Sequence, residues 1–93
     1  MTVRIHTTIP GINQSEFDAI HKALTSSGEP PKGLVFHSSA SVDGGWLIVD
    51  FWDSRPDYDA ATPLVQKAIE SAGVAPSGPP SVEEFPVYEI LQP

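Results

Sequence analysis

The stretch that decides the fold is Gly45-Trp46-Leu47-Ile48-Val49-Asp50-Phe51-Trp52. Apart from Asp50, residues 46–52 are all leucine, β-branched or aromatic, a composition typical of a strand. Successive side chains of a strand point to opposite faces, so Trp46, Ile48 and Trp52 share one face. The other face holds Leu47, Val49 and Phe51. Because neither set is polar, we expect both faces to be buried.

A β-hairpin leads into this strand. The strand-like run Leu34-Val35-Phe36-His37 precedes it, and the pair Asp43-Gly44 between the two runs is a strong hairpin signal. A two-residue loop at Asp43-Gly44, or a symmetric loop over residues 42–45, gives one register, which a three-residue loop would break. In this register the opposite pairs are Val42 and Gly45, Ser39 and Ile48, His37 and Asp50, and Val35 and Trp52.

The remaining chain supplies two helices and two outer strands. Residues 2–9 predict a strand, and a helix follows from the cap Asn13 to the break at residues 26–31. A second helix is expected from the cap Ser54 to Gly73, kinked or restarted at Pro63. The last strand is expected over residues 82–91, with Pro86 inside it, which is tolerable at a sheet edge. The order βαββαβ predicts one α+β domain over residues 1–93, a ferredoxin-like sandwich with antiparallel sheet order 4-1-3-2.

Composition limits the partners and the compartment. The net charge of −7 repels nucleic acid and anionic membrane, and the basic residues do not cluster. The chain has no cysteine, so neither disulfides nor thiolate metal sites are available. Without a signal-peptide pattern or a long apolar run, we expect a cytoplasmic protein.

The doubly apolar strand predicts a homodimer. A two-layer sandwich covers one sheet face and leaves the other to water, where polar side chains are expected. Exposing that much apolar surface would forgo several kcal/mol at roughly 25 cal/mol per Å². A second copy packed on the bare face removes this cost, and loops folded over the sheet of a monomer are the alternative.

His37 and Asp50 form the main candidate site. As cross-strand partners their Cβ atoms would lie about 5 Å apart. An aspartate that orients a histidine and makes it more basic is typical of a general base. The alternative is a structural pair that satisfies itself in a buried sheet and fixes the register. The sequence does not say which sheet face meets the helices, so the pair could face the helices or the dimer seam.

Other candidate residues are aromatic or lie apart from this pair. Trp46, Trp52 and Tyr58 would wall an apolar pocket for a substrate. His6 could lie near the same pocket, because its strand neighbours that of Asp50, but its face is open. His21 is interpreted as a residue at the boundary of the first helix. The spacing of the three histidines is unlike a zinc site, so no metal is expected.

The βαββαβ order and the segment from Gly45 to Ser54, a strand that ends in an aromatic, Asp and Ser before a helix, resemble one known family. This is the dimeric α/β-barrel superfamily, specifically its antibiotic-biosynthesis-monooxygenase-like branch; residues 33–37 are similar to small members of it. The resemblance implies a homodimer with a ligand cavity between sheet and helices. Family activities include cofactor-free oxygenation of polycyclic phenols, haem breakdown and lactone isomerisation. Haem-degrading members ligate iron with a histidine on the second helix, and residues 54–73 contain none.

Two functions therefore stay open. The first is an enzyme, a cofactor-independent monooxygenase or isomerase of an aromatic or polyketide-like molecule, with His37 as base and Asp50 as its orienting group. The second is a non-catalytic dimer that binds a small apolar ligand or assists a pathway partner.

Overall fold

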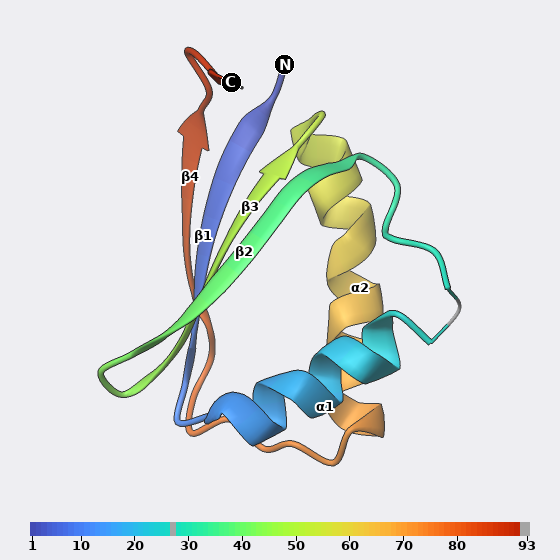
Figure 1. The fold of residues 1–93 in the computed structure, drawn as a ribbon, viewed down its shortest axis with the longest axis vertical. Helices are drawn as coiled ribbons and strands as arrows, with labels where there is room; N and C mark the ends of the chain where they lie inside the picture. Colours follow the sequence, from blue (N-terminus) through green and yellow to red (C-terminus); the bar gives the residue numbers. More distant parts are fainter. Residues whose placement is uncertain (27, 92–93) are drawn as a thin grey trace.

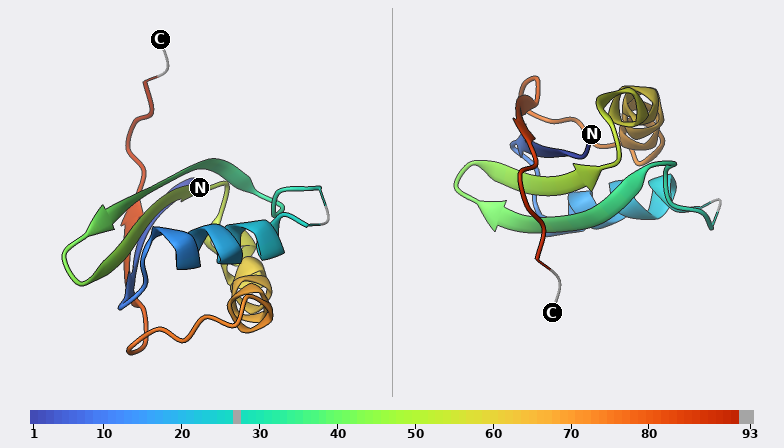
Figure 2. Two further views of the ribbon diagram at one scale, coloured as in Figure 1. Left: turned by 60° about the horizontal axis from the view of Figure 1, so that its bottom comes forward. Right: turned by 90° about the horizontal axis from the view of Figure 1, so that it is seen from above.

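The computed structural model describes residues 1–26 and 28–91. Along the chain it has β1 (Val3–Pro10), α1 (Gln14–Leu24), β2 (Leu34–Val42), β3 (Gly45–Trp52), α2 (Arg55–Ser71) and β4 (Ser81–Pro86). The strands pair in the order β2-β3-β1-β4, every neighbour antiparallel. Both helices lie on one side of the sheet, and no element covers the other side among the described residues (Figures 1 and 2). The predicted α+β fold and sheet order are confirmed.

Local signals explain where the helices begin. Asn13 accepts a hydrogen bond from the Glu16 backbone N–H at 2.9 Å, and the Glu16 carboxylate accepts one from the Asn13 N–H at 3.1 Å. This capping box satisfies two of the free donors at the start of α1. Ser54 caps α2 by accepting from the backbone N–H of Asp57.

The second helix does not restart at Pro63, one of the two expected outcomes, because α2 runs through this residue as one helix. Proline removes one helical donor, which leaves the carbonyl of Asp59 without its usual partner. Both residues are exposed, so water can satisfy that carbonyl at little cost.

The last strand is shorter than expected and ends at Pro86 rather than near residue 91. Pro86 lies opposite Val3, the first residue of β1, so β4 has no partner strand beyond this point. The backbone N–H of Val87 still reaches the Thr2 carbonyl at 3.1 Å. Proline and the end of the neighbouring strand together terminate the ladder.

The hairpin register is confirmed for three of the four predicted pairs and wrong at the fourth. Val42 lies opposite Gly45, Ser39 opposite Ile48 and His37 opposite Asp50, but Leu34 instead of Val35 lies opposite Trp52. A bulge between Leu34 and Phe36 inserts one extra residue. It turns Leu34 into the core against Trp52 and leaves Val35 exposed.

The core between sheet and helices consists of two apolar clusters. The Trp46 cluster joins β1, β3 and both helices and contains Ile9, Ile12, Phe17, Ile20, Trp46 and Ala68. The Trp52 cluster lies toward the start of β1 and contains Val3, Ile5, Trp52 and Ala61. Between Ile48, which packs on the first cluster, and Trp52 in the second, the helix-facing side of β3 carries Asp50.

Candidate functional site

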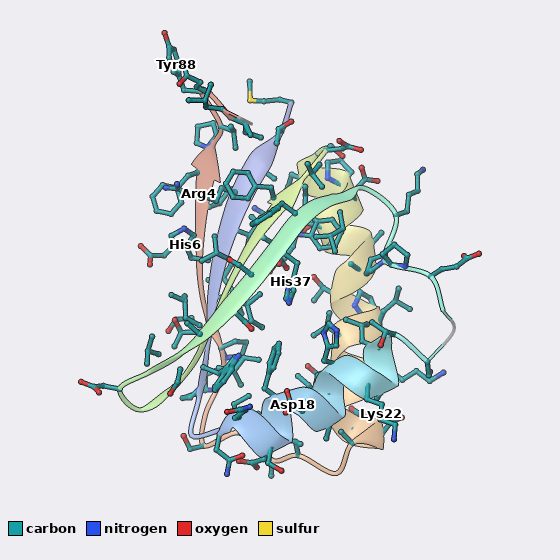
Figure 3. All side chains as sticks on the ribbon, in the orientation of Figure 1. Arg4, His6, Asp18, Lys22, His37 and Tyr88 are labelled. Atoms are coloured by element: carbon teal, nitrogen blue, oxygen red, sulfur yellow. The ribbon has the colours of Figure 1, made fainter. Side chains whose placement is uncertain are left out.

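His37 and Asp50 form a hydrogen-bonded pair where the two clusters meet. The register of β2 and β3 places them opposite each other, with His37 Nδ1 2.6 Å from Asp50 Oδ1. Their side chains are 31% and 19% exposed, so the pair is partly buried and still reached by solvent. Figure 3 shows His37 on the side of β2 that faces the helices. The pair therefore faces the helices and not the other side of the sheet.

The pair has the electrostatics of an oriented base. The hydrogen bond to Asp50 raises the pKa of His37 above its ordinary value of 6.5, partial burial opposes the rise, and the charge of Asp50 adds to it. An ionised carboxylate only accepts hydrogen bonds, so the neutral imidazole carries its proton on Nδ1 and donates it to Asp50. The lone pair of the ring is then on Nε2, where it can accept a proton from another molecule.

The raised pKa makes stability depend on pH in a defined direction. A group whose pKa is higher in the folded than in the unfolded chain stabilises the fold below the unfolded value of 6.5, and this contribution is lost as pH rises through the folded value. We therefore expect the free energy of unfolding to fall as pH rises from about 6.5 upward. Urea titrations at fixed pH steps measure it, and His37→Gln should remove this part of the pH dependence. A wild-type profile that rises over the same window would contradict the pair.

Aromatic rings from α1 pack beside the pair. The Phe17 ring is nearly parallel to His37 at 6.3 Å between centroids and stacks on Trp46 at 5.1 Å. The His21 ring stacks on His37 at 5.8 Å and also lies 5.9 Å from Phe17. Two histidines and an aspartate thus share one end of this aromatic group.

The sequence pattern did not indicate that His21 lies beside the candidate site; it predicted only a residue at the boundary of the first helix. The signal was present, because Phe17 and His21 are four residues apart and therefore neighbours on one helix face. The sequence does not show how far this face of α1 lies from β2.

The other predicted site residues are not brought to His37 as a group. Trp46 is 9% exposed and stacks on Phe17 in the core. Trp52 is 3% exposed and packs edge-on against Tyr58 at 6.0 Å, in the other cluster. Tyr58 lies near Arg55, whose guanidinium is 5.4 Å from the ring centre.

His6 lies on the opposite face of the sheet. It pairs with Val49 and Glu83, one position out of step with the helix-facing residue Ile5, and its ring contacts Phe85 at 5.0 Å. In Figure 3 it lies beside β4, away from His37. The expectation that His6 shares the pocket of His37 is therefore wrong, since neighbouring residues of a strand point to opposite faces.

Two further properties concern the described part of the chain only. No three His, Asp or Glu side chains of residues 1–26 and 28–91 come together as ligands for a metal ion. Within the same ranges, neither helix is long and apolar enough to cross a membrane.

Comparison with known proteins shows what shares this architecture. No family model and no curated protein matches the sequence. Among solved structures, SnoaB, a cofactor-independent oxygenase from Streptomyces nogalater, superposes with a TM-score of 0.63 at 12% identity over 97% of this chain and 95% of that one. A putative antibiotic biosynthesis monooxygenase from Caulobacter crescentus gives 0.68 at 13% identity over 95% and 91%. A dimeric ferredoxin-like protein of unknown function from Thermobifida fusca gives 0.63 at 11% identity over 94% and 92%.

The TM-scores establish a common fold, and the low sequence identities leave the activity open. These two neighbours match 97% and 95% of this chain, so the similarity extends over nearly the whole fold. The chain has the ferredoxin-like α+β fold of the antibiotic-biosynthesis-monooxygenase-like proteins.

Proposed function

We propose that this chain is a small enzyme that removes a proton from an activated C–H or phenolic O–H group of an aromatic molecule, and that dioxygen then oxidises the resulting anion without a bound cofactor. The observation that supports it is the 2.6 Å hydrogen bond between His37 and Asp50 at a partly exposed position. An oriented imidazole with a raised pKa is the standard means of abstracting such a proton.

The residues have separate roles in this reaction. His37 Nε2 accepts the proton, and Asp50 holds the ring and stabilises the imidazolium that forms. The adjacent rings of Phe17 and His21 favour a flat aromatic substrate by stacking. Trp46 supports Phe17 from the core, and Trp52 with Tyr58 holds the other end of the sheet against α2.

The oxidation balances with dioxygen as the oxidant. A ring CH₂ group that becomes C=O gives up four electrons and two protons, and dioxygen takes them, placing one oxygen atom in the product and one in water. The role of SnoaB as a cofactor-independent oxygenase supports this choice over others. An isomerase would use the same first proton transfer and return the proton to another carbon.

The test separates proton transfer from oxidation. Under argon in deuterium oxide, the wild type should exchange the activated hydrogen of a panel of phenols and tricyclic ketones, and in air it should consume oxygen with the same compounds. Since His37 must be neutral to act, the rate should rise with pH through its raised pKa. We expect His37→Gln to reduce both rates by roughly 10²–10⁴-fold, whereas Lys22→Gln, an exposed change in the same helix as His21, should leave them unchanged.

A non-catalytic ligand-binding protein is the second candidate. The observation that favours it is that His37 and Asp50 already satisfy each other across the sheet, as a structural pair would. Exchange and oxygen uptake absent from the wild type, together with lost stability in His37→Gln and Asp50→Asn, would favour this candidate over the enzyme.

The working unit we propose is a homodimer formed through the sheet face away from the helices, called here the outer face. Leu47, Val49 and Phe51 of β3 point to it and are only partly buried in the single chain. On β2, Phe36 points the same way and is 58% exposed. A second copy would cover this surface, and the dimeric state of the Thermobifida fusca neighbour supports it.

A further inference from the structure

The ring of His21 lies beside His37 without a hydrogen-bond partner of its own. The two ring centres are 5.8 Å apart, and Phe17, one helical turn before His21, contacts the same ring at 5.9 Å. Within residues 1–26 and 28–91 the His21 imidazole takes part in no hydrogen bond or ion pair, and the residue is exposed. A neutral imidazole carries one N–H, so this ring has a donor to offer to a bound molecule.

The spacing of the two imidazoles suits one oxygen atom held by both. Two hydrogen bonds of about 2.9 Å that meet at one oxygen span at most about 5.8 Å between their nitrogens. The ring centres of His21 and His37 are separated by the same 5.8 Å, and their planes differ by 25°, so a molecule beside the rings meets the edges of both. An oxygen placed there can contact His37 Nε2, which Asp50 leaves free, and the N–H of His21.

An oxyanion formed at this place needs a donor besides His37. When His37 takes the proton, the O–H bond of the bound molecule breaks and an N–H bond forms at Nε2. The imidazolium then lies against the carboxylate of Asp50, which offsets much of its positive charge. A second N–H directed at the same oxygen stabilises the negative charge as it develops.

The basic side chains that the structure places near aromatic or acidic partners do not serve this position. Arg4 lies over an aromatic ring of the outer face, and Arg55 forms ion pairs with two carboxylates. Lys22 follows His21 directly, and consecutive side chains of a helix point about 100° apart. Figure 3 shows Lys22 on the side of α1 away from His37. The N–H of His21 is therefore the donor that α1 brings to the base.

We propose that His21 donates a hydrogen bond to the oxygen from which His37 removes the proton, and so selects molecules that ionise at a hydroxyl group on an aromatic ring. This inference rests on the proposed function and narrows its activated C–H or O–H group to a phenolic O–H. Phe17 holds the His21 ring in place from the same helix face. Since Asp50 bonds to His37 and not to His21, the two histidines have different roles, one as base and the other as donor.

Proton transfer from bound 4-nitrophenol tests this role, because the anion of the probe absorbs visible light and the neutral phenol does not. At a pH at which the free probe is mostly neutral, we expect probe bound to the wild type to show anion absorption. His21→Phe keeps an aromatic ring and removes the N–H. The ratio of anion to neutral phenol in the bound probe should then fall by about 10–100-fold, the effect of one hydrogen bond to a charged group. His21→Gln restores a donor and should retain most of the anion.

Two variants and a second ligand serve as controls. His6→Phe makes the same substitution on the outer face and should leave the anion ratio unchanged. Ser39→Ala removes a hydroxyl two residues from His37 on the same face of β2, the competing donor, and should also leave it unchanged. 4-Nitroanisole has no O–H, so the wild type and His21→Phe should bind it equally. Circular dichroism checks that each variant folds.

An NMR titration without the probe separates direct contact with the oxygen from an effect through His37. We expect the pKa of His37 to be the same in the wild type and in His21→Phe. A pKa that falls in the variant by enough to account for the lost anion overturns the inference. So does a wild type that leaves the bound probe neutral or does not bind it, and so does His21→Phe with the anion ratio of the wild type.

These outcomes are distinct from failure of the proposed function. Exchange and oxygen uptake by the wild type, with an anion ratio that does not depend on His21, overturn this inference alone. An anion ratio that depends on His21, in a protein without exchange or oxygen uptake, supports the donor and overturns the enzyme.

Discussion

Asp50→Asn is expected to lower the pKa of His37 and to reduce proton exchange and oxygen uptake by roughly 10²–10⁴-fold. The carboxylate raises the pKa of His37 chiefly through its hydrogen bond, and secondly through its charge. An amide has neither the charge nor a fixed direction of hydrogen bonding. If its NH₂ group donates to Nδ1, the ring proton moves to Nε2, and the atom that should accept the substrate proton is already occupied.

The measurement is a titration of the histidine Cε1–H signals by NMR, joined to rates over a pH series. Asp43→Asn is the matched control, because it removes one carboxylate at the exposed hairpin turn without touching His37. Asp50→Asn should also reduce stability by about 1 kcal/mol, because a neutral hydrogen bond replaces a charge-assisted one at a partly exposed position. If stability falls by this amount while the wild type shows no rate to lose, the pair is structural and the enzyme proposal fails.

Much of this fold is encoded locally and was accessible from the sequence. The caps at Asn13 and Ser54, and the turn at Asp43-Gly44, are short-range signals whose partners lie within a few residues. The turn then fixed the register of the hairpin, and the register placed His37 opposite Asp50. The pairing of His37 with Asp50 is thus a consequence of the two-residue turn between β2 and β3.

The predictions from sequence fail at positions where more than one structure is compatible with the same local pattern. Leu34 and Val35 are both apolar, so periodicity cannot show that a bulge sends Leu34 inward against Trp52. His6 has a polar neighbour on one side and an apolar one on the other, and its face follows only from the pairing of β1 with β3. The stacking of His21 on His37 depends on where α1 crosses the sheet, which no local signal specifies.

Trp52→Ala is expected to destabilise the chain by about 3–5 kcal/mol, the usual cost of removing a buried tryptophan. The side chain is 3% exposed and packs among Val3, Ile5 and Ala61, with Tyr58 against its edge. A domain of this size has a total stability of about 5–15 kcal/mol. We therefore expect the melting temperature to fall by roughly 12–40 °C at a fixed protein concentration.

Trp52→Phe separates the apolar volume of this side chain from its N–H group. Trp52 Nε1 is buried without a hydrogen-bond partner in the described structure, and such a donor costs about 1–3 kcal/mol. Phenylalanine fills less space but removes that donor, so its net cost should be about 1 kcal/mol or less, since the two effects oppose each other. The two variants together distinguish a core role of Trp52 from a role in lining a substrate pocket. A core residue shows a large loss of stability in alanine and a small one in phenylalanine, whereas a residue that only walls a substrate pocket shows unchanged melting in both and a raised KM.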